Sequence, residues 1–231
     1  MAKLSNFLFG IVAKCALLSL PGGALADIYV CDTSAIRVTA TTETLARSVC
    51  VGAENALRQL GQCSLALKQP VTIQLVEQVV HPFGYDCFAY ADCESASIQL
   101  SEPTTLAEAV AANEIYSEVP IDQMFEGLIA HELTHLVVNQ IIPEGLSRVD
   151  HEYMAYVMQM QSYPPQTRQI FLNKIDATQK ADPMRINSFF MRARPTLFAA
   201  YAWAHFSQAE NGCAHFQRLL SGKTTFNYMI Y

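Results

Sequence analysis

Residues 131–135 read His131-Glu132-Leu133-Thr134-His135. Two histidines four positions apart project from the same face of an α-helix, so both imidazole rings can reach one metal ion. Glu132 lies between them, where a carboxylate can act as general base on a metal-bound water. The stretch therefore predicts a helix that carries Zn²⁺ on His131 and His135, with Glu132 as the catalytic base.

The flanking sequence is that of a buried helix. From Leu128 to Val137 the only charged residue is Glu132, and the stretch contains neither proline nor glycine. Asp122 and Glu126 lie near the expected start of the helix, where its macrodipole favours negative charge. The alternative is a buried helix whose histidines are satisfied by hydrogen bonds alone. Burying His, Glu and His together is unfavourable unless something pairs them, so we favour the metal.

The first 26 residues have the pattern of a secretory signal peptide. Lys3 gives a small basic start, Phe7–Leu20 is mostly apolar, and Ala24-Leu25-Ala26 supplies an A-x-A cleavage site. An uncleaved membrane anchor is the alternative, although the apolar stretch is short for a membrane span. We therefore predict an exported protein, periplasmic or secreted, with no stable membrane insertion after cleavage.

The remaining chain, residues 27–231, is long enough for one domain with its own hydrophobic core. The formal net charge of the whole sequence is −6, and loss of Lys3 and Lys14 without any acidic residue takes it to −8. No basic run occurs, which argues against nucleic acid and against anionic membrane surfaces as partners.

Six cysteines follow the predicted signal peptide, and an even number fits disulfides formed in an oxidising compartment. Six cysteines allow fifteen pairings, among which a sequence does not choose. Cys87 and Cys93 flank a short expected turn and form the first pair we predict. No two cysteines have the C-x-x-C spacing of a cysteine zinc cluster. The six are Cys31, Cys50, Cys63, Cys87, Cys93 and Cys213.

Hydrophobic periodicity predicts an α+β order of elements. A helix is expected over residues 42–60, then strands over residues 71–76, 85–90 and 95–100, with a turn at Ala91-Asp92. A partly helical stretch over residues 103–119 precedes the helix that carries the motif. After Gly145 the sequence has a helical pattern only, over residues 148–161, 166–175, 195–207 and 213–220. We expect a small N-terminal mixed sheet packed on a buried HExxH helix, followed by a helical C-terminal half.

A catalytic zinc ion usually has three protein ligands and one open position, so a third ligand must come from elsewhere in the chain. A metzincin would have glycine three residues after the second histidine, and a further histidine three residues beyond that. This sequence has Val138 and Ile141 at those positions, which excludes the metzincin class. The third ligand is therefore expected on a later helix.

Asp150-His151-Glu152 offers three candidates in a row for that ligand. We favour Glu152, because it shares one helix face with Tyr156 and Gln159, and apolar stripes frame that face. A polar stripe framed in this way can line a site. If the stripe faces water instead, His151 is the better ligand and Asp150 is the third choice.

Residues 152–156 read Glu-Tyr-Met-Ala-Tyr. Together with His131, Glu132 and His135, this run resembles the gluzincins, the thermolysin-like zinc metallopeptidases that combine HExxH with a downstream glutamate. The resemblance covers roughly residues 95–161. The sequence departs from the family pattern in having Tyr156 where an aspartate commonly supports a zinc-bound histidine, and in the short spacing of sixteen residues before Glu152.

The resemblance implies a zincin-like fold in which His131, His135 and Glu152 hold Zn²⁺. In such enzymes the edge strand of the sheet holds an extended substrate by main-chain pairing, and Ser95–Leu100 is the candidate by its position. The developing oxyanion needs a further hydrogen-bond donor. Tyr156, Tyr201 and His205 are available for that role.

We predict an exported zinc-dependent metallopeptidase that hydrolyses a peptide or protein substrate through a zinc-activated water. One alternative is a non-catalytic exported binding protein with a structural or vestigial zinc site, which the missing aspartate favours. Another is a zinc hydrolase of cell-wall amides, because the same activation of water serves any amide.

Overall fold

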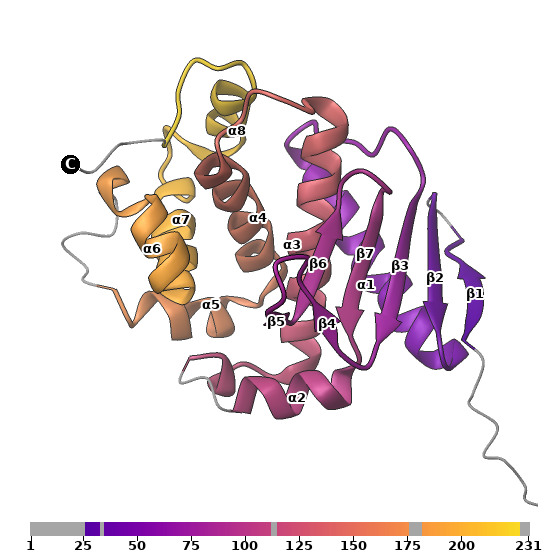
Figure 1. Cartoon of the computed structure of the whole chain (residues 1–231). Coiled ribbons are helices and arrows are strands. Elements are labelled where there is room, and N and C mark those ends of the chain that lie inside the picture. Colours follow the sequence, from indigo (N-terminus) through magenta and orange to yellow (C-terminus); the bar gives the residue numbers. More distant parts are fainter. Residues whose placement is uncertain (1–25, 33–34, 112–114, 176–181, 227–231) are drawn as a thin grey trace, which may run out of the picture.

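A mixed five-stranded sheet lies on one side of the molecule and a group of helices on the other (Figure 1). The computed structural model describes residues 26–32, 35–111, 115–175 and 182–226. The predicted signal peptide, residues 1–26, lies outside the described residues except for Ala26. The α+β class with a mixed sheet and a helical C-terminal half is confirmed.

The sheet has the strand order β1 (Asp27–Val30), β2 (Ile36–Ala40), β3 (Val71–Val76), β7 (Ser97–Ser101) and β6 (Ala89–Asp92). The three central strands are parallel, and both edge strands run antiparallel to their neighbours. Helix α1 (Glu43–Gln62) connects the parallel strands β2 and β3. A separate hairpin, β4 (Val79–Val80) with β5 (Asp86–Cys87), precedes β6.

Helix α3 (Ile121–Ile141) occupies the centre of the fold. It contacts α1, β6 and β7 on one side and α4 (Arg148–Ser162) on the other. Between Met124 and Val138, α3 has buried residues on all of its faces, as expected for a helix that other elements enclose. The helix predicted from the apolar flanks of the HExxH motif is therefore present.

The other helices surround this centre (Figure 1). Within the described ranges, no helix combines the length and the apolarity that crossing a membrane requires. The further helices and 3₁₀ turns are α2 (Pro103–Ala111), η1 (Tyr116–Glu118), α5 (Pro165–Leu172), η3 (Pro183–Arg185), α6 (Ser188–Ala193), α7 (Pro195–Phe206) and α8 (Gly212–Leu220).

The expectation that a helix comes first in the fold was wrong, because β1 and β2 precede α1. The alternation that marks β2 is present in the sequence, since Ile36, Val38 and Ala40 are buried while Arg37 is exposed. Five residues are a weak signal on their own. Strand β2 becomes stable through its parallel pairing with β3, which lies more than thirty residues later in the chain.

The predicted edge strand was also wrong. Ser95–Leu100 corresponds to β7, which lies inside the sheet between β3 and β6, so its backbone groups are paired on both sides. The edge is β6. The turn between the two strands lies at residues 93–96, because the Asp92 carboxylate accepts hydrogen bonds from the backbone N–H of Glu94 and the hydroxyl of Ser95.

Among the cysteines that the structure describes, two disulfides are formed, Cys31–Cys50 and Cys63–Cys213. Such bonds are compatible with an oxidising compartment. Cys87 and Cys93 are free, so the predicted pairing of these two was wrong. Strand β6 lies between them, and its four extended residues span about 13 Å, well beyond the separation of about 7 Å that a disulfide can bridge.

The Cys63–Cys213 disulfide joins the end of α1 to the start of α8 across a sequence separation of 150 residues. Replacing both cysteines by alanine should lower the free energy of unfolding by about 2–5 kcal/mol, because the unfolded chain gains the freedom that this long loop restricts. Urea denaturation measures the change. Cys93→Ala, at an exposed free cysteine, is the control and should leave the midpoint unchanged. Equal stability of the two variants would contradict this expectation.

Candidate metal centre

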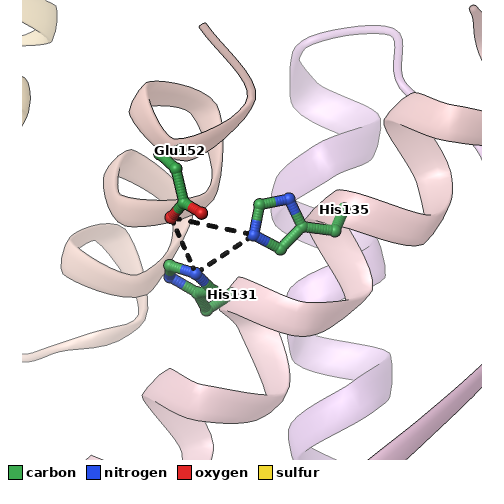
Figure 2. Close-up of side chains that lie close together, drawn as sticks. All are labelled: His131, His135 and Glu152. Carbon is green, nitrogen blue, oxygen red and sulfur yellow. Dashed lines mark hydrogen bonds and ion pairs between the residues drawn. The ribbon is translucent and has the colours of Figure 1, made fainter. Parts of the chain in front are cut away.

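The segment between α3 and α4 turns the chain back, so that the two helices pack against each other. Gly145 has φ of +108°, a conformation that side-chain-bearing residues rarely adopt. Ser147 then caps α4, since its hydroxyl oxygen accepts a hydrogen bond from the backbone N–H of Asp150. This start of the helix turns Glu152 toward α3. Figure 2 shows Glu152 facing both His131 and His135.

Three potential ligand atoms converge at this point (Figure 2). The Nε2 atoms of His131 and His135 are 3.2 Å apart. The Oε2 atom of Glu152 lies 3.5 Å from Nε2 of His131 and 3.9 Å from Nε2 of His135. Ligands that bind tetrahedral Zn²⁺ at about 2.0–2.1 Å are about 3.3 Å from one another. The group could therefore hold a metal ion.

The hydrogen bonds of Gln159 determine which nitrogen of His131 carries the proton and which one can bind a metal ion. The Gln159 side chain donates from Nε2 to the Tyr163 hydroxyl at 2.9 Å, so its Oε1 is the atom 3.1 Å from His131 Nδ1. That oxygen accepts the Nδ1 proton, and Nε2 of the neutral imidazole keeps its lone pair. A lone pair directed at the carboxylate of Glu152 is stable only with a proton or a cation between them. The donor set thus fits a bound metal.

The electrostatics of the three side chains are coupled. Burial acts to lower the pKa of His131, but its hydrogen bond to Glu152 and the charges of Glu132 and Glu152 raise it above its usual value. Burial lowers the pKa of His135 to about 3. Burial acts to raise the pKa of Glu152, yet the hydrogen bond from His131 and nearby positive charges lower it to about 2. Glu152 is therefore an anion, and the site attracts a cation.

Glu132 lies in the same pocket but outside the group of three. Burial raises the pKa of Glu132 to about 7, and the charge of Glu152 acts in the same direction. The His131 charge and a hydrogen bond from the backbone N–H of Ala91 oppose this rise. The carboxyl group thus sits between the potential metal ligands and the edge strand β6.

A pocket of about 600 Å³ opens over these residues, between α3 and α4 on one side and β6 on the other. Its lining combines the acidic and histidine side chains with an aromatic group from the β4–β5 hairpin and with Arg148. The lining residues are His81, Tyr85, Cys87, Phe88, Ala89, Tyr90, Ala91, Cys93, Tyr116, Leu128, His131, Glu132, His135, Leu146, Arg148, His151, Glu152, Tyr156 and Gln159.

The two alternative ligands are not part of the converging group. His151 lines the pocket, with its ring centre 6.1 Å from that of His135, but it is not part of the converging group. Asp150 is buried and fastens the C-terminal segment to α4. It accepts hydrogen bonds from the hydroxyl of Thr225 and the backbone N–H of Phe226, each at 2.7 Å. The geometry favours Glu152 as the third ligand.

Of the three predicted oxyanion donors, one lies at the site. Tyr156 lines the pocket, and its ring centre is 4.5 Å from that of His131. Tyr201 packs against Phe190, and His205 is hydrogen bonded to the Tyr153 hydroxyl at 2.9 Å; neither lines the pocket.

Sequence reasoning missed Tyr116, which hydrogen bonds to Tyr156 and also lines the pocket. No local pattern marks Tyr116, which reaches the site from the 3₁₀ turn that precedes α3. Gln159, in contrast, could be recognised from the sequence as a residue near the site, because it lies two helical turns after Glu152 on the same face of α4.

If the group holds zinc, Gln159→Leu should weaken zinc binding by about 10- to 100-fold, the usual effect of losing the partner that orients a metal-bound histidine. The variant leaves the Nδ1 proton of His131 without an acceptor. Titration of apo-protein against a zinc chelator gives the dissociation constant. Gln161→Leu, on the same helix but hydrogen bonded to Gln62 outside the pocket, is the matched control. A Gln159 variant with the affinity of this control would show that the hydrogen bond does not orient the ligand.

A second histidine pair lies outside the pocket. His205 of α7 and His215 of α8 have ring centres 4.7 Å apart. Burial, together with the charge of Arg218, lowers the pKa of each histidine to about 4, although Glu210 and Asp150 act in the opposite direction. In the unfolded chain a histidine has a pKa of about 6.5. Between these values the unfolded state binds protons that the folded state does not.

Stability contributed by this pair is therefore present above about pH 6.5 and is lost as the pH falls toward about 4. The thermal midpoint of the wild type should fall over this range more steeply than that of His205→Asn/His215→Asn. Asparagine keeps a hydrogen-bond acceptor for Tyr153 and Arg218 but does not titrate. Scanning calorimetry at several pH values gives the comparison. Parallel curves for the two proteins would exclude the pair as a source of acid sensitivity.

Comparison with known proteins relates the chain to one family. A family described as "Family of unknown function (DUF6639)" matches residues 36–229, which include every residue of the candidate metal centre. No curated protein and no solved structure matches the chain. Since the family match extends over most of the sequence, the chain belongs to DUF6639.

Proposed function

We propose that this protein is an exported zinc-dependent peptidase with a zincin-like fold and a gluzincin type of metal site. One observation carries the proposal. His131, His135 and Glu152 converge from two packed helices, and Glu132 lies beside them in the same pocket. Burial of two carboxylates and two histidines together is unfavourable in a purely structural role. A bound cation and a reacting water account for the arrangement.

His131, His135 and Glu152 would hold Zn²⁺, which when bound polarises a carbonyl group and makes water more acidic. Glu132 takes the proton of the attacking water and delivers it to the leaving amine. Tyr156 stands beside His131, and its hydroxyl group, which hydrogen bonds to Tyr116, would turn to donate to the oxygen that becomes negative. Gln159 keeps the His131 ring in its orientation.

The outer side of β6, which faces away from β7, supports a peptide as substrate. In an antiparallel pair, the N–H and C=O groups of one residue point to the same side and alternate along the strand. The carbonyl of Phe88 accepts from Ser101 of β7, so the main-chain groups of Ala89 and Ala91 face away from β7. Both residues line the pocket. The Ala91 N–H donates to the Glu132 carboxylate, so an extended peptide would pair with the other outward main-chain groups of this edge, beside Glu132.

The proposal is tested with purified protein lacking residues 1–26, loaded with zinc, and two substrates. One is an unfolded protein and the other is purified cell-wall peptidoglycan. Mass spectrometry of the products should reveal new internal N-termini in the unfolded protein, and a chelator should prevent them. Hydrolysis of amide bonds in the peptidoglycan alone would favour an amidase. Intact substrates in both reactions, with zinc bound, would favour a non-catalytic binding protein.

A further inference from the structure

The β4–β5 hairpin carries a closed loop at the margin of the pocket. The backbone N–H of His81 donates to the carbonyl of Tyr85 at 2.9 Å, and the N–H of Gly84 donates to the carbonyl of His81 at 2.7 Å. The N–H of Phe83 donates to Nδ1 of His81 at 3.2 Å. Gly84 has φ of +83°, which permits the tight turn. The loop is thus fixed by its own hydrogen bonds.

Three aromatic side chains gather around the ring of His81. Tyr85 is stacked on it with ring centres 4.4 Å apart, Phe83 lies at 5.0 Å, and Tyr90 meets it edge-on at 5.1 Å. Ring pairs at such distances stabilise one another. Even so, Phe83 is 80% exposed and Tyr85 is 47% exposed. The cluster is ordered by its internal contacts and remains open to solvent.

This aromatic cluster is continuous with the pocket. His81, Tyr85 and Tyr90 belong to the lining that also contains Glu132, and Phe83, which is not part of the lining, lies against His81 at its margin. Val80 of the same hairpin is 51% exposed, so three large apolar side chains are exposed on one short element. Apolar surface concentrated beside a pocket is typical of a binding site, whereas scattered exposed apolar residues are not.

We propose that Phe83 and Tyr85 form the subsite that selects the substrate, by receiving a large apolar or aromatic side chain that flanks the scissile bond. The inference rests on the proposed peptidase function. The occupant is a side chain of a peptide, because Ala89, which follows the hairpin after one residue, directs its main-chain groups away from β7, where a peptide backbone can pair with the edge of β6. Phe83 offers only ring carbon, which suits an apolar partner.

The selectivity is measured on a library of peptides from a digested proteome, in which mass spectrometry identifies the residues beside each cleaved bond. Wild type should prefer Phe, Tyr, Leu or Met over Ala and Gly by about tenfold, the effect of one good ring contact. Phe83→Ala and Tyr85→Ala should lose most of this preference, and Tyr85→Phe should keep it. Phe189→Ala, which removes a 63% exposed ring from α6 rather than from the β4–β5 hairpin, is the matched control and should cleave like wild type.

A second readout does not need turnover. Phenylalanine hydroxamate and alanine hydroxamate bind a zinc ion directly, and calorimetry on zinc-loaded wild type, Phe83→Ala and Tyr85→Ala compares their affinities. In one outcome, wild type binds phenylalanine hydroxamate more tightly than alanine hydroxamate, the hairpin variants lose this preference, and yet no peptide is cleaved. That result would exclude the peptidase function but support the subsite. Equal selectivity in wild type and the hairpin variants would overturn the subsite. A second result would also overturn the subsite: N-acetylglucosamine oligomers bind to wild type but not to the hairpin variants, and the peptide selectivity of the variants equals that of wild type.

Discussion

Glu132→Gln is expected to reduce peptide hydrolysis by at least about 100-fold while the protein still binds one equivalent of zinc, because general-base catalysis contributes about 10²–10⁴ to the rate. Glutamine has the size of glutamate and can still accept the hydrogen bond from the backbone N–H of Ala91. It cannot take a proton from water. The change therefore separates proton transfer from metal binding.

The rates and the zinc content of the Glu132 variant are compared with those of Glu126→Gln. Glu126 is on the same helix and is also partly buried, but it does not line the pocket. This control should keep both activity and metal. A Glu132 variant that cleaves as fast as wild type would exclude Glu132 as the base, and one that loses zinc would identify it as a ligand.

Glu152→Ala should release zinc under conditions in which wild type retains it. Removal of Glu152 leaves two histidines in a buried site and takes away the negative charge that attracts the cation. The loss of affinity should exceed the roughly 10- to 100-fold effect of losing a hydrogen-bonding partner of a ligand. Zinc per protein after dialysis against a weak chelator, measured by mass spectrometry of the elements, gives the result.

His151→Ala is the matched control for the third ligand, since His151 precedes Glu152 on α4 and lines the same pocket. Its ring lies apart from the converging group, so its zinc content should equal that of wild type. If only the His151 variant loses zinc, the third ligand is His151 and the geometry of the metal-loaded site differs from the one described above.

The central helix could be predicted from sequence because the information for α3 is local. An uncharged run without proline or glycine surrounds the motif, and prolines mark both ends of the segment. The position of Glu152 could be predicted for a similar reason. Ser147 caps α4, and the start of the helix determines on which of its faces Glu152 lies. Helical spacing then places Gln159 on the face of Glu152.

Other features depend on residues far apart in the chain. The strand β7 has a clear alternating pattern, but whether it lies at the edge or inside the sheet depends on β3 and β6, which no local pattern reveals. The Cys63–Cys213 disulfide joins residues that only the packing of α8 near the end of α1 brings together. Tyr116 reaches the pocket through packing alone, so its role beside Tyr156 required the structure.

Zinc-dependent catalysis at the group formed by His131, His135 and Glu152 is tested most directly by titrating metal-free protein with zinc while the rate of peptide cleavage is recorded. The rate should rise in proportion to added zinc up to one equivalent per chain and then remain constant. The same titration of Glu132→Gln should bind one equivalent without any rise. Cleavage that does not depend on zinc, or an absence of cleavage at every level of zinc, would contradict the proposed function.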